Sequence, residues 1–82
     1  MPAQDGDKAL AVAFAAHEGW AFAEAYRRYA TVLYSAAYTV LGNAEDAQDC
    51  IADAFAKLLR ARGPYSAARG NLRNFLIVCV RN

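Results

Sequence analysis

The chain has 82 residues, of which 57% are hydrophobic, and its formal net charge at neutral pH is +1. This length allows one domain at most, and no apolar run is long enough to span a membrane. Two cysteines are too few for a disulfide framework, and the acids before the first apolar stretch argue against a secretory signal, so we expect a single reduced, cytoplasmic domain over residues 1–82.

The charges are distributed unevenly along the chain. Residues 1–56 hold eight acidic against three basic side chains, whereas residues 57–82 hold six basic side chains and no acidic one. A cationic C-terminal part indicates a polyanion as partner, although short helical proteins also show uneven charge by chance. The motifs within each part are therefore needed to distinguish a polyanion-binding surface from a chance distribution of charge.

A short first helix is predicted from about Lys8 to His17, after a disordered tail over residues 1–7. Gly19 is expected to provide the C-terminal stop of this helix. The only histidine, His17, falls in the last turn, where a partial positive charge suits the helix dipole. We prefer this structural role for His17 over a catalytic one.

A second, long helix is predicted from about Trp20 to Leu41. Gly42 suits the left-handed residue that ends a helix, and Asn43 can cap the next one. So short a link predicts a helical hairpin. Apolar residues recur in this helix at spacings of three and four, in a stripe more typical of a core than of a cofactor site: Phe22, Tyr26, Tyr29, Leu33, Ala37 and Val40.

The third helix is predicted from about Ala44 to Ala61. Asp53 and Lys57 can form an ion pair at i,i+4 spacing. Three aspartates with two bases after them form a face that is either an ordinary solvated surface suited to the helix dipole or a docking surface for a basic protein: Asp46, Asp49, Asp53, Lys57 and Arg60. The apolar stripe of this helix consists of Ala47, Ile51, Ala54, Phe55 and Leu58.

Residues 62–71 form the one substantial loop, which Gly63-Pro64 separates from the third helix. Asn71 can cap a fourth helix. The chain ends in the middle of the helical pattern, so we expect the native protein to be longer. The apolar stripe of the fourth helix consists of Leu72, Phe75, Leu76, Cys79 and Val80.

No enzyme signature is found in the sequence. One histidine cannot build a multi-histidine metal site, and neither a CxxC pair nor a glycine-rich phosphate loop is present. Cys50 and Cys79 fall on or near apolar stripes and are interpreted as small buried hydrophobes, with a redox pair as the alternative if two helices bring them together. We therefore expect no catalysis, no metal and no cofactor.

The loop and the fourth helix carry a binding constellation. Arginines can neutralise phosphates, an aromatic ring can stack on a base, and amides can form hydrogen bonds to base edges. Together these abilities are typical of single-strand binding. The candidate DNA-binding residues are Arg62, Tyr65, Arg69, Asn71, Arg73, Asn74 and Arg81.

The order of these segments over residues 21–82 resembles region 2 of extracytoplasmic-function (ECF) sigma factors, within the sigma-70 family. The sequence departs from the family pattern at Ala52, where the family has glutamine, at Phe75, where it has tryptophan, and at Gly19-Trp20, where it has Gly-Asp. The segments that carry the resemblance are Leu41-Gly42, Asp46-Ala47-Gln48-Asp49, Asp53-Ala54-Phe55, Leu72-Arg73-Asn74-Phe75-Leu76 and Val80-Arg81-Asn82.

The resemblance implies an all-α fold of sigma region 2 type, a small bundle of three long helices plus a short N-terminal helix. It also implies a partner, core RNA polymerase, bound through the basic coiled coil of its largest subunit. The implied function is recognition and melting of the promoter −10 element in transcription initiation. The implied polymerase-binding residues are Asp46, Gln48, Asp49 and Asp53.

The resemblance implies that the loop from Arg62 to Asn71 would capture a base flipped out of the −10 element, with Tyr65 as the candidate for stacking. Flipping costs on the order of a few kcal/mol, which stacking and edge contacts must offset. Asn82 matches the family's terminal asparagine, which lies near that base pocket. The region 4 domain that reads the −35 element is absent from this sequence, and an anti-sigma factor is an expected partner. The alternative is a helical protein-interaction module of the same fold that has lost DNA binding.

Overall fold

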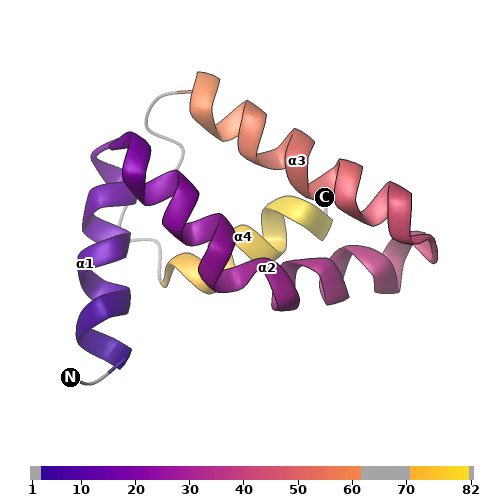
Figure 1. Cartoon of the computed structure of the whole chain (residues 1–82), viewed down its shortest axis with the longest axis horizontal. Helices are drawn as coiled ribbons and strands as arrows, with labels where there is room; N and C mark the ends of the chain where they lie inside the picture. The colour runs from indigo at the N-terminus through magenta and orange to yellow at the C-terminus, as the bar shows by residue number, and fades with distance from the viewer. Residues whose placement is uncertain (1–2, 62–70, 82) are drawn as a thin grey trace.

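The computed structural model describes residues 3–61 and 71–81, and in these segments the chain forms four helices and no strand (Figure 1). The predicted all-α class is confirmed. The helices are α1 (Ala3–Ala15), α2 (Gly19–Leu41), α3 (Ala44–Arg60) and α4 (Leu72–Arg81). Among the helices described, none combines the length and the apolarity that crossing a bilayer would need.

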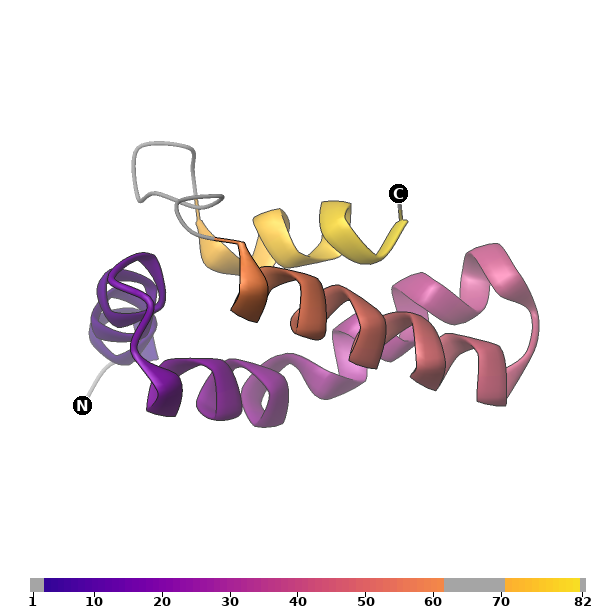
Figure 2. The same cartoon turned by 90° about the horizontal axis from the view of Figure 1, so that it is seen from above.

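The long helix α2 is the element on which the other three helices pack. Helix α1 crosses the N-terminal end of α2, and α3 runs back along α2 as the second arm of a helical hairpin (Figures 1 and 2). Helix α4 contacts both arms of this hairpin. The two helices that carry the predicted binding residues, α3 and α4, are therefore neighbours on one scaffold.

The hydrophobic core joins all four helices in one cluster. Its largest fully buried side chains are Leu10 of α1, Leu33 of α2 and Leu76 of α4. On α3 and α4, the buried residues belong to the apolar stripes that the sequence predicted. On α2, Ala21 and Ala25 are completely buried, and small side chains of this kind let the packed helices approach closely.

Two members of the predicted α2 stripe do not lie in the core. Tyr26 is 43% exposed and sits at the flank of α2, where its ring edge meets Phe55 of α3 with ring centroids 5.3 Å apart. Val40 is 56% exposed because it lies in the last turn of α2, where the chain turns back into α3. Periodicity gives the side of a helix that is apolar, but it does not show how far the neighbouring helices cover that side.

The predicted caps are confirmed where the structure describes them. Gly42 has a φ of 69° and donates its N–H to the carbonyl of Tyr38, which ends α2. The side chain of Asn43 accepts from the N–H of Asp46 at 3.0 Å, and Asn71 accepts from the N–H of Asn74 at 2.8 Å. An N-cap of this type contributes about 1 kcal/mol to helix stability.

The first helix and its end differ from the prediction. Helix α1 begins at Ala3, inside the segment expected to be a disordered tail, because a polar helical turn leaves no mark in the apolar periodicity. The helix ends before His17, whose φ is 64°, so His17 and not Gly19 supplies the left-handed residue. The N–H groups of His17 and Glu18 bond the carbonyls of Phe14 and Ala13, which is a Schellman motif.

Candidate functional site

The three predicted aspartates form an acidic face on α3. At 100° per residue, Asp46, Asp49 and Asp53 lie within about 60° of one another around the helix axis, and all three are exposed. The carboxylate of Asp53 pairs with Lys57 at 3.0 Å, as expected, but both side chains are more than half exposed, and such pairs contribute little to stability. The acidic face therefore has the exposure that a docking surface requires.

Gln48, the fourth residue expected to contact polymerase, is exposed but lies apart from the aspartates. It is rotated about 100° or more around α3 from each of them. Its position is close to that of Phe55, whose ring meets Tyr26 of α2. Gln48 therefore sits on the flank of α3 that faces α2, apart from the acidic face.

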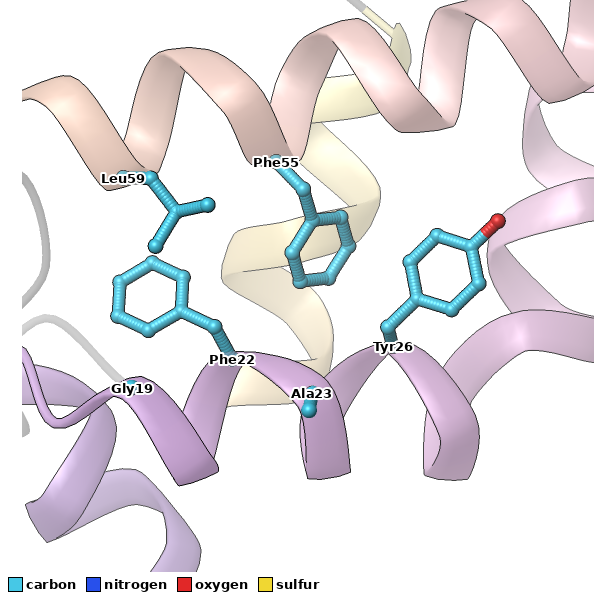
Figure 3. Close-up of a pocket in the computed structure, with 6 residues that line it drawn as sticks. All are labelled: Gly19, Phe22, Ala23, Tyr26, Phe55 and Leu59. Atoms are coloured by element: carbon cyan, nitrogen blue, oxygen red, sulfur yellow. The ribbon is translucent and has the colours of Figure 1, made fainter.

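An apolar groove runs between α2 and α3 on this flank (Figure 3). Phe55 and Leu59 project from α3 toward Phe22 and Tyr26, which project from α2. The groove has a volume of about 320 Å³. Its lining residues are Gly19, Phe22, Ala23, Tyr26, Phe55 and Leu59.

Large apolar side chains that line the groove remain exposed. Leu59 is 50% exposed and Tyr26 is 43% exposed. Contiguous exposed apolar surface on a small protein marks a site of interaction with a partner. The apolar periodicity of the sequence did not predict the groove, because it placed Tyr26 in the core and gave Leu59 no position on a surface. The sequence does contain one indication of the groove: Leu59 is a large apolar residue directly beside Leu58, the last residue of the predicted α3 stripe.

A basic face on α4 contains the three predicted DNA-binding residues that α4 carries. Arg73, Asn74 and Arg81 are all exposed, and they lie within about 100° around the axis and extend about 12 Å along it. The guanidinium of Arg73 donates to the side-chain oxygen of Asn74 at 3.5 Å. No carboxylate among residues 8–61 and 71–81 is within ion-pair distance of Arg73 or Arg81, so neither guanidinium is paired with a described acid.

The arginines of α2 are in a different electrostatic state. Arg27 and Arg28 bind the carboxylate of Glu24 at 2.7 and 3.0 Å. The hydrogen bond from Arg27 lowers the pKa of Glu24, and the same bond raises the pKa of Arg27. Both arginines therefore share one anionic partner within α2, whereas Arg73 and Arg81 have no ion-pair partner among the residues described with side chains.

The other predicted DNA-binding residues are only partly placed. The side-chain oxygen of Asn71 is engaged as the cap of α4, which gives this residue a structural role that the sequence also predicted. Arg62, Tyr65, Arg69 and Asn82 lie outside the described residues.

The two cysteines act as packing residues and not as a bonded pair. Both are free thiols, half-buried between helices. Cys50 donates to the carbonyl of Val80 at 3.2 Å, which ties α3 to the C-terminal end of α4. Burial raises the pKa of Cys79, which disfavours the reactive thiolate. Within the part of the chain that the structure describes, no cluster of His, Cys, Asp and Glu could hold a metal ion.

Comparison with known protein families identifies a match to this chain. The family model described as Sigma-70 region 2 matches residues 25–82, which include most of α2 and all of α3 and α4. The acidic face and the basic face both fall inside the matched segment. Comparison with curated proteins found no match, and comparison with solved structures found none.

Proposed function

The chain belongs to the sigma-70 region 2 family, whose members act in RNA polymerase binding and promoter melting, and we propose that it is region 2 of an ECF-type sigma factor. In this role it works in the cytoplasm, where it binds core polymerase with α3 and the single strand of a melted −10 element with α4. It acts as a binding module in transcription initiation and performs no chemistry of its own.

One observation carries this proposal: the helices that pack together as neighbours present exposed charges of opposite sign. The acidic face of α3 suits a basic protein surface, and Arg73 and Arg81, which have no ion-pair partner among the described side chains, suit phosphates. Complementary charges mainly raise the association rate and set orientation. The acidic face repels DNA and so directs the nucleic acid toward α4.

Polymerase docking also uses the apolar groove. In this proposal the aspartates meet the basic coiled coil of the largest polymerase subunit, while the groove takes apolar side chains of the same partner. Gln48 lies on the groove side of α3, close to Phe55 around the helix axis, and can form a hydrogen bond to a partner that enters there. Buried apolar contacts of this kind limit dissociation, which charge alone does not. The groove is equally suited to an anti-sigma factor, which would then compete with polymerase.

The DNA side combines described and undescribed residues. Arg73, Asn74 and Arg81 form the described part of the surface, and Arg62, Tyr65, Arg69, Asn71 and Asn82 are proposed to complete it. Each phosphate neutralised on a single strand contributes roughly −0.7 to the slope of log affinity against log salt. Two to three arginine contacts therefore give a slope of roughly −1.4 to −2.1, which is measurable with a short oligonucleotide.

The experiment measures binding of the chain to core RNA polymerase and, separately, to a single-stranded −10 oligonucleotide over a series of salt concentrations. We expect both partners to bind, and oligonucleotide affinity to fall steeply as salt rises. Polymerase binding without any oligonucleotide binding at low salt would favour the protein-interaction module that lacks DNA binding. Absence of binding to either partner would refute the proposed function.

A further inference from the structure

His17 occupies a backbone conformation that normally belongs to glycine. Its φ is 64°, and it is the non-glycine residue with positive φ in the described segments. A left-handed conformation is unfavourable for a residue with a Cβ, and such a conformation persists only where other contacts hold it. Glycine at this position would complete the Schellman motif without strain. The side chain of His17 must therefore make contacts that offset the strain.

Two contacts of the His17 ring reach other helices. Its Nε2–H donates to the carbonyl oxygen of Leu59 at 2.8 Å, across 42 residues of sequence. The edge of the ring also meets Phe22, with ring centroids 5.0 Å apart and the ring planes at 62°. The carbonyl of Leu59 belongs to the last turn of α3, where carbonyl groups have no partner within the helix. His17 thus caps α3 from the turn between α1 and α2.

Both partners of His17, Leu59 and Phe22, line the apolar groove. The α2–α3 hairpin is closed at one end by the covalent link through Gly42 and Asn43. At its other end the two helices have no such link, and there the His17 ring lies between the α1–α2 turn and the last turn of α3. That contact therefore ties the α1–α2 turn to this end of the groove.

We propose that His17 is a positioning residue for the docking surface: its bond to Leu59 holds the end of α3 against α2 and so sets the shape of the apolar groove that polymerase enters. This inference rests on the proposed function. His17 itself does not touch the partner. It acts by fixing where Leu59 and Phe22 present their side chains.

Three substitutions at position 17 distinguish a role in positioning the groove from a role in fold stability alone. His17→Gly removes the ring and the backbone strain together, and His17→Asn tolerates the left-handed conformation but is too short to reach Leu59. His17→Gln restores an amide donor with a longer reach. We expect His17→Gly and His17→Asn to keep Tm within about 5 °C of the original chain but to bind core polymerase about fivefold more weakly. We expect His17→Gln to regain most of the lost affinity, even though glutamine fits the left-handed backbone less well.

Amide hydrogen exchange provides a reading that does not depend on polymerase. The N–H of Ala61 bonds the carbonyl of Lys57 in the last turn of α3, and its exchange should accelerate in His17→Gly and His17→Asn. The positioning role would be overturned if the exchange of the Ala61 N–H did not change in these variants. It would also be overturned if the polymerase affinities of the variants followed their Tm values and not the presence of a hydrogen-bond donor at position 17. If the original chain fails to bind polymerase while exchange accelerates as expected, the docking role falls with the proposed function and the cap on α3 stands.

Discussion

Truncation of Leu59 to alanine tests whether the apolar groove belongs to the docking surface. A fully buried leucine side chain contributes about 2 kcal/mol through the hydrophobic effect. Leu59 is 50% exposed in the free chain, so about half of this amount already stabilises the fold. The other half, about 1 kcal/mol, is available to a partner that covers the side chain. Leu59→Ala should therefore lower affinity for core polymerase about fivefold and lower Tm by about 4–8 °C.

The matched control is Val12→Ala, which truncates a side chain that is 60% exposed on α1, away from the groove. This variant should lose a similar or smaller amount of stability and no affinity for polymerase. Affinity can be measured by fluorescence anisotropy and Tm by circular dichroism on the same samples. Equal polymerase affinities for the two variants would show that the groove stays outside the interface and that the reasoning from exposed apolar area is wrong.

Two further predictions concern stability. Asn43→Ala removes the side-chain cap of α3 and should cost about 1 kcal/mol in chemical unfolding, whereas Asn43→Asp keeps an acceptor for the Asp46 N–H and should cost much less; equal losses would reject the cap. Because burial raises the pKa of Cys79 in the folded chain, its contribution to stability is fully present below the ordinary thiol range and is lost as pH rises through and above it. The unfolding midpoint should accordingly fall less between about pH 8 and 10 in Cys79→Ala than in the original chain, and superimposable pH profiles would contradict this.

The sequence was most informative where local chemistry decides the structure. Gly42 and Asn43 predict the hairpin, because a left-handed glycine ends one helix and an amide side chain starts the next within two residues. The same logic places the start of α4 at Asn71. The acidic face could also be predicted, because three charged residues at helical spacing share a side of the helix however the core is packed.

Features that depend on how two helices meet could not be predicted in the same way. Tyr26 belongs to the predicted apolar stripe, but only the approach of α3 decides that its ring lines a groove and stays partly exposed. The bond between His17 and Leu59 joins residues 42 positions apart, and no local pattern encodes it. The turn after α1 was misassigned for a related reason: the expected glycine stop is present at Gly19, but the left-handed position falls on His17.

The central claim, that the acidic face and the basic face have separate partners, is tested most directly by reciprocal charge reversal. Asp49→Lys and Arg73→Glu change one exposed residue each and should leave helix content unchanged. Each protein is titrated against core RNA polymerase and against a single-stranded −10 oligonucleotide. The account predicts that Asp49→Lys weakens only polymerase binding and that Arg73→Glu weakens only oligonucleotide binding. If either variant weakens both partners equally, or neither, the two faces do not divide these tasks.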